Sequence, residues 1–235
     1  MDVPLLIPEV NAEHLELIPV QKHNRSWKGF IVTNPNCTVI PMVMALQPLM
    51  QFGLNKVTVV SMQAVSGAGY PGVPSLDILD NVIPFIDGEE EKVEEEALKL
   101  LGNFYGSEVK PAPVIVSAQC NRVNVNDGHT ECVSVQLSSK PGVEKIKKTF
   151  REFNPLLGLA LPSSPARPLV VREELNRPQP RRDRDLEKGM AVMVGRIREC
   201  PVLDYKFVLL GHNTIRGAAG AAILNVELMK SKGFI

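Results

Sequence analysis

Apolar residues recur along the chain with two different spacings, and the pattern predicts both strands and helices. Apolar runs rich in β-branched residues predict strands at Trp27–Thr33, Lys56–Val65, Pro113–Arg122, His129–Leu137, Met190–Ile197 and Tyr205–Leu210. Helical spacing occurs in Thr38–Phe52, Glu89–Leu101, Val143–Phe153 and Thr214–Met229. Because strands and helices mix without a strict βαβ alternation, the expected fold class is α+β.

Three further segments are interpreted from their turn residues. Val3–Ile18 contains two prolines and is predicted to be an edge strand with a loop, and Pro155–Arg184 is a connection rich in Pro and Arg. Asn126–Gly128 lies between two predicted strands and favours a hairpin turn, because Asp-Gly tolerates positive φ. In such a hairpin the side chains of Arg122 and His129 share one face of the sheet.

Composition narrows the function classes. The chain has 235 residues, of which 44% are hydrophobic and 22% charged, which is typical of a globular protein. Lys plus Arg number 26 and Asp plus Glu number 26, so a general nucleic-acid binder is not expected. The uncharged stretch 29–55 holds three prolines, which argues against a membrane-spanning helix. Four cysteines show no zinc-ribbon or disulfide framework, and we expect no metal and a cytoplasmic location.

Cys37 is the strongest candidate for chemistry. It follows Asn36, a good N-cap residue, at the start of the predicted helix Thr38–Phe52. The backbone N–H groups and the dipole at a helix start favour negative charge, so we expect a lowered thiol pKa and a thiolate nucleophile. The alternative is a small buried apolar residue.

A thiolate that reacts with a carbonyl group needs a proton partner. His129 is a candidate because the predicted hairpin places it on the same face as Arg122, although it can equally be a surface histidine. A metal site formed by Cys120, His129 and Cys132 is disfavoured, since His129 and Cys132 are three apart on one strand and face opposite sides.

Two other motifs carry little information by themselves. The glycine-rich stretch Ser66–Gly69 lacks the spacing of a phosphate-binding loop and is typical of a turn. The glutamate runs 89–91 and 94–96 are interpreted as a solvated helix face.

Taken together, the motifs resemble those of a known family. They are Asn34-Pro-Asn-Cys-Thr38, Gln63-Ala-Val-Ser-Gly-Ala-Gly69, Asn121-Arg122 through Gly128-His-Thr-Glu131, and His212-Asn-Thr-Ile-Arg-Gly-Ala-Ala219. In this order the sequence resembles aspartate-semialdehyde dehydrogenase over nearly the whole chain. The segment from Tyr70 to Pro84 is similar to the archaeal and fungal branch.

The resemblance implies a reaction in lysine, threonine and methionine biosynthesis. L-aspartate 4-semialdehyde, phosphate and NADP interconvert with L-4-aspartyl phosphate and NADPH. Cys37 is implied to form the thioester, His129 to act as general acid and base, and Gln63 to orient the thioester carbonyl.

The resemblance also implies binding roles. Arg122 is implied to hold the substrate carboxylate, a task suited to a guanidinium group. Glu96 is implied to meet the substrate amine and Lys99 the phosphate, although neighbouring glutamates leave the alignment of this Glu-x-x-Lys pair ambiguous. The residues implied to contact the cofactor are Ser66, Gly67 and Asn213.

The implied fold is the C-terminal catalytic domain of the glyceraldehyde-3-phosphate dehydrogenase type, with a mixed sheet covered by helices and remnants of a Rossmann domain. Residues 1–35 are expected to be a remnant of the dinucleotide-binding domain and 36–212 the catalytic and dimerisation domain. Residues 213–235 are expected to form a C-terminal helix that packs on the cofactor domain. The implied assembly is a homodimer or homotetramer.

The family begins with a Gly-rich dinucleotide-binding turn, and nothing before Cys37 resembles it. We therefore expect a fragment or a separately encoded catalytic part that is inactive alone. The alternatives are a malonyl-CoA or succinyl-CoA reductase, in which Arg122 and Glu96 are the positions that discriminate, and a non-catalytic dimerising fragment.

Overall fold

A mixed seven-stranded sheet forms the centre of the computed structural model, which describes residues 2–235. Its strand order is β2-β5-β1-β6-β9-β8-β7. The bounds are β1 Leu54–Gln63, β2 Val82–Ile83, β5 Ile115–Val123, β6 His129–Leu137, β7 Leu169–Arg172, β8 Val192–Glu199 and β9 Tyr205–Gly211. A separate pair consists of β3 Asn103–Tyr105 and β4 Glu108–Lys110.

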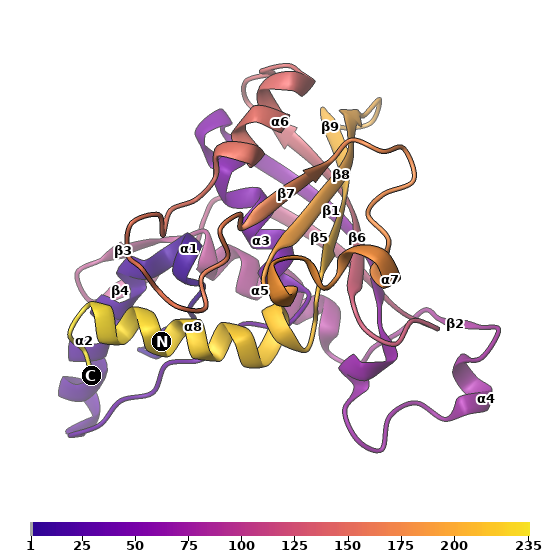
Figure 1. Cartoon of the computed structure of the whole chain (residues 1–235). Coiled ribbons are helices and arrows are strands. Elements are labelled where there is room, and N and C mark those ends of the chain that lie inside the picture. The colour runs from indigo at the N-terminus through magenta and orange to yellow at the C-terminus, as the bar shows by residue number, and fades with distance from the viewer. Residues whose placement is uncertain (1) are drawn as a thin grey trace.

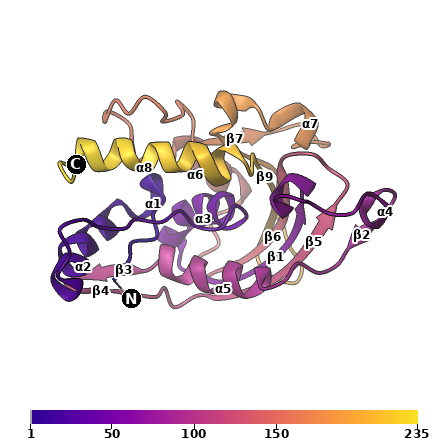
Figure 2. The same ribbon diagram turned by 90° about the horizontal axis from the view of Figure 1, so that it is seen from below.

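Helices cover one face of this sheet, as the α+β prediction requires (Figures 1 and 2). The covering helices are α3 Val39–Leu46, α5 Glu89–Leu100 and α6 Val143–Glu152. All eight residues of α3 are buried, so it forms the middle of the main hydrophobic core. A 3-10 turn, Gln47–Phe52, continues α3, and Gly53 ends it with φ 72°, which confirms the predicted helix and its stop signal.

The predicted hairpin between β5 and β6 is wrong. Strand β1 lies between them, parallel to β5 and antiparallel to β6. The reason is that β1 is itself an apolar strand with buried Val57 and Val59, and it gains two partners in this position. The Asp127-Gly128 turn therefore connects two strands that are not neighbours.

The N-terminal segment is helical, so the predicted edge strand at Val3–Ile18 is wrong. It forms α1 Pro8–Asn11, a 3-10 turn and α2 Leu17–Arg25. Pro8 occupies the first position of α1, where a missing N–H costs nothing, and the side chain of Asn11 accepts a hydrogen bond from Ile7 N. Pro8 therefore starts a helix here rather than interrupting a strand.

Two other sequence expectations also need correction. Trp27–Thr33 is not a strand, because its one ladder contact is the bridge between Leu5 and Thr33. The connection Pro155–Arg184 contains edge strand β7 and the short helix α7 Pro180–Asp183, which the proline and arginine content masked.

The two ends of the chain pack on each other. Helix α8, Gly220–Ser231, lies beside α1 and α2 (Figure 1), and residues from both ends share a second hydrophobic cluster that includes Leu15, Ile18, Leu224 and Leu228. The segments expected to be remnants for another domain thus bury apolar surface within this chain.

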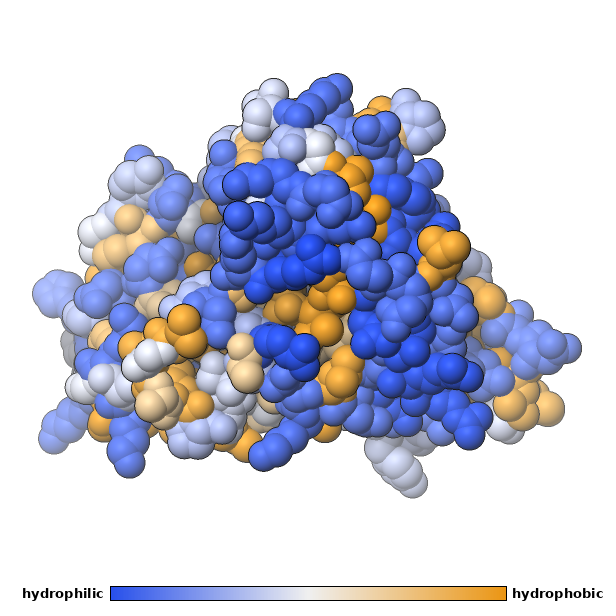
Figure 3. Space-filling model, turned by 45° about the horizontal axis from the view of Figure 1, so that its top comes forward, coloured by the Kyte–Doolittle hydropathy of each residue, from blue (hydrophilic) through white to orange (hydrophobic). Residues whose placement is uncertain are grey.

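The surface in Figure 3 is mostly hydrophilic, with small apolar groups. Among residues 2–235 no helix is long and apolar enough to cross a membrane. An arm that carries α4 Ser75–Ile78 and β2 projects from the body (Figure 1).

Candidate active site

Cys37 lies in the first turn of the helix that contains α3. Asn36 caps this turn, because its Oδ1 accepts a hydrogen bond from Thr38 N at 2.8 Å and its carbonyl oxygen accepts one from Ile40 N at 3.2 Å. The capping geometry therefore begins the helix just before Cys37, although regular α-helix starts at Val39. This agrees with the position predicted from the sequence.

His129 meets Cys37 across the site. The distance from Cys37 Sγ to His129 Nε2 is 3.2 Å, and the histidine is fully buried at the first position of β6. His129 is thus not a surface histidine. Gly217 packs behind the thiol, and a Cβ added there would lie 2.6 Å from the Cβ of Cys37. The nucleophile is held between a helix start and a glycine backbone.

Three neighbouring strand ends bring the polar side chains of the site together. Gln63 at the end of β1 aligns with Arg122 of β5, and the pairing of Met62 with Thr130 places Gln63 next to His129. All three side chains are buried on the helix-covered face. Arg122 and His129 therefore share a face as predicted, but β1 rather than a hairpin brings them together.

The glycine-rich turn Ser66–Gly69 packs against these strand ends. Arg122 Nη1 donates to Ala64 O at 2.8 Å. A Cβ on Gly67 would lie 2.8 Å from Arg122 Nη1 and 3.0 Å from His129 Cε1, so only glycine fits at this position without displacing them. Ser66–Gly69 therefore has a packing function at the site.

Glu89 is a polar centre of the site that sequence reasoning missed. It is buried at the start of α5, and its carboxylate accepts hydrogen bonds from Asn36 Nδ2 at 3.0 Å and Gln63 Nε2 at 2.9 Å. The interpretation of the glutamate runs as a solvated face is wrong for Glu89, whereas Glu91 and Glu95 are exposed as predicted. The helical spacing of Glu89 with buried Val93 was the signal that could have found it.

Two more glutamates of α5 protect the sheet edge. Strand β5 pairs with β2 at only two residues, so its outer N–H groups lack a strand partner over most of its length. Glu90 accepts a hydrogen bond from Cys120 N and Glu94 from Ala118 N, each at 2.9 Å. These carboxylates cover an edge that would otherwise be open to pairing with another chain.

Glu96 and Lys99 lie further along α5. Glu96 Oε2 accepts a hydrogen bond from Asn36 N at 2.7 Å, and Lys99 Nζ donates to Val3 O at 2.9 Å. Burial is the main cause that raises the pKa of Glu96 and lowers that of Lys99. Glu96 thus supports the cap of the Cys37 helix from behind, and Lys99 contacts the N-terminal segment.

The Asn213 side chain links the glycine-rich turn to the start of β6 by two hydrogen bonds. Its Oδ1 accepts a hydrogen bond from Gly128 N and its Nδ2 donates to Ser66 Oγ, both at 2.8 Å. Because both ends of the amide are engaged, Asn213 fixes the position of Ser66 next to His129. The structure brings these two predicted residues together.

The expected lowering of the Cys37 pKa is wrong for this state of the molecule. Burial, followed by the negative charge of Glu89, raises the pKa of the Cys37 thiol to about 11, against the backbone hydrogen bond and Arg122. Burial, Arg122 and His212 lower the pKa of His129 to about 3. Desolvation exceeds the effect of the helix start. The pair is therefore an uncharged thiol and an uncharged imidazole.

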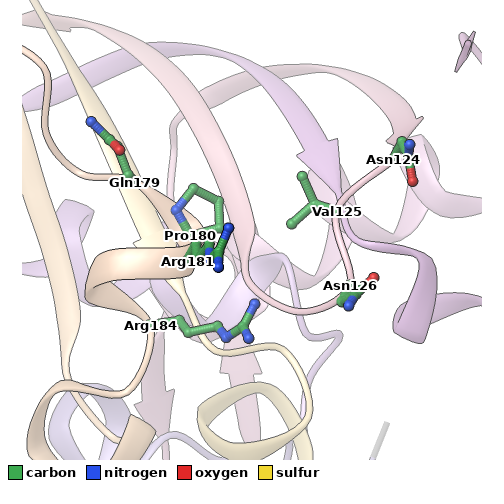
Figure 4. Close-up of a pocket in the computed structure, with 7 residues that line it drawn as sticks. All are labelled: Asn124, Val125, Asn126, Gln179, Pro180, Arg181 and Arg184. Carbon is green, nitrogen blue, oxygen red and sulfur yellow. The ribbon is translucent and has the colours of Figure 1, made fainter. Parts of the chain in front are cut away.

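A hollow of about 620 Å³ lies beside the site, between the loop before β6 and α7 (Figure 4). Its lining includes Asn124, Asn126, Gln179, Arg181 and Arg184. Val65 N and Ser66 N donate to the carbonyl oxygens of the same loop, so its wall is continuous with the glycine turn. Cys37 is not among its lining residues.

A capped cysteine beside a buried histidine, at the ends of three neighbouring strands, is the arrangement of an enzyme that uses a thiol nucleophile. The family described as "Semialdehyde dehydrogenase, dimerisation domain" matches residues 46–216. Aspartate-semialdehyde dehydrogenase of Archaeoglobus fulgidus is 61% identical over 228 residues, which cover 97% of this chain and 66% of that protein. The one from Methanothermobacter thermautotrophicus is 54% identical, with 97% and 67% covered.

The crystal structure of aspartate semialdehyde dehydrogenase with NADP from Candida albicans superposes with a TM-score of 0.88 at 44% identity. It covers 100% of this chain, which in turn covers 68% of that one. The chain belongs to the aspartate-semialdehyde dehydrogenase family, and it spans about two thirds of the length of these relatives.

Proposed function

We propose that this chain carries the catalytic chemistry of aspartate-semialdehyde dehydrogenase, the NADP-dependent interconversion of L-aspartate 4-semialdehyde plus phosphate with L-4-aspartyl phosphate. The observation that carries the proposal is the 3.2 Å approach of Cys37 Sγ to His129 Nε2 at a capped helix start. Family membership supplies the identity of the substrate.

In the proposed reaction Cys37 Sγ forms a bond to the aldehyde carbon, and His129 Nε2 exchanges protons with the sulfur and the carbonyl oxygen. The adduct would become a thioester by loss of a hydride to bound NADP. In the second half, a phosphate oxygen attacks the thioester carbon, and the C–S bond breaks to leave the free Cys37 sulfur.

We assign binding to the strand ends around Cys37. Arg122 supports a carboxylate, because its planar guanidinium offers two parallel donors. Gln63 orients the carbonyl, and Glu89 holds the Gln63 amide at 2.9 Å. These side chains lie on the same face as His129, so they surround one substrate position.

For the substrate amine and the phosphate we propose Glu89 and Lys92 in addition to the expected Glu96 and Lys99. Glu89 and Lys92 have the same Glu-x-x-Lys spacing, and Glu89 contacts the Gln63 and Asn36 side chains of the site. Glu96 instead reaches only the backbone of Asn36 among the site residues.

NADP supplies the hydride acceptor when it is bound. The chain fits one end of such a cofactor: Ser66 and Gly67 stand at an accessible turn, which Asn213 fixes at 2.8 Å beside His129. We propose that these three residues hold the nicotinamide end of the cofactor. We assign residues 36–212 as the catalytic and dimerisation part.

We propose that the open face of the sheet forms a homodimer. Alternate residues of β1, β5 and β6 are exposed there, including Val60, Ile115 and Cys132. The proposal is supported by the family match, which is described as a dimerisation domain, and by the absence of a helix layer over this face among residues 2–235. Sedimentation should show a dimer that Cys132→Arg converts to a monomer, whereas Glu91→Arg on α5 should remain a dimer. A dimeric Cys132→Arg variant would contradict this face.

The second half-reaction tests the proposed chemistry without the cofactor. The chain is mixed with L-4-aspartyl phosphate and analysed by peptide mass spectrometry for an aspartyl thioester and for released phosphate. We expect acylation at Cys37 alone, and none in Cys37→Ser.

Cys200 provides the matched control for this experiment. Although partial burial opposes it, hydrogen bonds from the backbone at Leu203 and Val202 lower the pKa of Cys200, so it is the cysteine best suited to nonspecific acylation. Cys200→Ser should leave the Cys37 adduct intact. An adduct on Cys200 with none on Cys37 refutes the proposed function.

A further inference from the structure

The two ring nitrogens of His129 have different hydrogen-bond partners. Nε2 lies 3.2 Å from Cys37 Sγ, and Nδ1 lies 3.1 Å from the backbone nitrogen of Ala64, which donates to it. Ala64 directly follows β1, and the ring is fully buried. The two contacts together fix the ring plane and its direction.

A backbone amide can only donate, so Nδ1 must accept with its lone pair and carries no proton. The single proton of a neutral imidazole then resides on Nε2 and points at Cys37. A protonated ring would set an Nδ1–H against the Ala64 N–H. The charged thiolate–imidazolium pair is therefore excluded for as long as the Ala64 bond persists.

The groups around the ring act in the same direction. Arg122 from β5 is cationic and His212 after β9 can become so, and both disfavour protonation of His129 to an imidazolium. On the other side, burial raises the pKa of Glu131 of β6, which favours the uncharged carboxyl form over a compensating negative charge. Glu89 of α5 faces the Cys37 thiol and opposes its ionisation.

We infer that the backbone amide of Ala64 is a positioning group that holds His129 as the Nε2–H tautomer and keeps Cys37 and His129 as an uncharged resting pair. His129 becomes a base only when the Ala64 N–H leaves Nδ1. Ala64 leads into the 3-10 turn Val65–Ala68, so a ligand that displaces this turn frees the ring. Only this last step rests on the proposed function.

Long-range ¹H–¹⁵N spectra of the ¹⁵N-labelled full chain at pH 7 test the tautomer directly. The signals of His129 are assigned by their loss in His129→Gln, with the amide spectrum as a check that this variant folds. We expect a protonated Nε2 and an unprotonated Nδ1, and a scalar coupling through the hydrogen bond between Nδ1 and the Ala64 amide nitrogen. An Nδ1–H tautomer or an imidazolium overturns the inference.

The pH dependence of Cys37 alkylation is the second measurement. An uncharged pair predicts a rate that rises steadily from pH 6 toward pH 10 as the thiol ionises. A preformed ion pair instead gives a plateau at low pH, and that plateau would refute the inference. Neither readout needs turnover, so a chain that fails the acylation test can still confirm the tautomer, and an active chain can still disprove it.

Discussion

At Cys37 the helix start and the burial of the thiol act in opposite directions. The backbone hydrogen bond and Arg122 favour the thiolate, while desolvation and Glu89 favour the thiol and prevail. A position in the first turn is therefore not sufficient to activate a cysteine. Activation has to come from proton transfer to His129, which depends on what the ring nitrogens contact.

Glu131 is a second buried group whose protonation matters. It is fully buried two residues after His129, and neither of its carboxylate oxygens has a hydrogen-bond partner in the described structure. Burial raises its pKa well above the ordinary value. A raised carboxyl pKa means that the folded state holds the proton more tightly, so stability is full at low pH and is lost as pH rises above the unfolded-state value.

Glu131→Gln should therefore stabilise the protein at neutral pH. Glutamine keeps the shape but cannot ionise, and each unit of pKa shift corresponds to about 1.4 kcal/mol at a pH above both values. We expect the free energy of unfolding, from urea denaturation, to exceed that of the wild type by at least about 1 kcal/mol at pH 7.5. The difference should vanish near pH 4. Exposed Glu91→Gln is the control, and a pH-independent difference would contradict the assignment.

At the scale of elements, the spacing of apolar residues and the turn residues predicted most of the buried helices and strands. They did not predict which strands pair with each other in the sheet. Strands β1, β5 and β6 were identified as elements, yet the local Asp127-Gly128 signal favoured a hairpin. Insertion of β1 between β5 and β6 is a long-range pairing that no local pattern contains. The helical spacing of Glu89 with Val93 indicates its burial, but its carboxylate partners lie 26 and 53 positions away and are likewise absent from any local pattern.

The turn before α8 makes a prediction at this scale. Residues Ile215–Ala219 form a π-helical turn whose Gly217 lies against Cys37. Gly217→Ala would place a methyl carbon 2.6 Å from the Cys37 Cβ, so the thiol or the turn must move. Because a displacement of about 1 Å can reduce a reaction rate about 100-fold, we expect acylation of Cys37 to fall at least about tenfold.

Gly29 offers the matched substitution for this test. An added Cβ there meets nothing within 4 Å, so Gly29→Ala should acylate like the wild type. Both variants are compared by the rate of thioester formation, with thermal unfolding as a check on the fold. Equal rates for Gly217→Ala and the wild type would show that the turn yields without disturbing the nucleophile.

For the whole molecule, the two ends of the chain behave as one packed unit. The expectation that segments 1–35 and 213–235 belong with a cofactor domain stays a prediction, but the sequence alone did not reveal that the apolar faces of these two segments also match each other. In the structure Leu6 and Leu15 pack with Leu224 and Leu228 in one cluster. The ends thus form part of the support behind the Cys37 helix.

A buried ion pair joins these two ends. Arg216 donates to Glu9 through Nη1 at 2.9 Å and Nη2 at 2.6 Å, and both side chains are fully inaccessible to solvent. Removal of one partner would leave the other charge buried and without its ion-pair partner. We expect Arg216→Ala to lower the free energy of unfolding by about 3–5 kcal/mol, as measured by urea denaturation.

The double substitution Glu9→Leu with Arg216→Met separates two causes of a stability loss. One is the cost of an unpaired buried charge, and the other is a specific requirement for the ion pair. Replacement of both charges by apolar side chains of similar volume is often neutral or stabilising, so we expect the double variant to recover most of the stability that Arg216→Ala loses. Because Arg216 adjoins Gly217, which lies against Cys37, we expect Arg216→Ala to slow the acylation of Cys37 and the double variant to restore it. If Arg216→Ala costs less than about 1 kcal/mol, which is the range of an exposed pair, the two ends separate readily in solution and do not support the site.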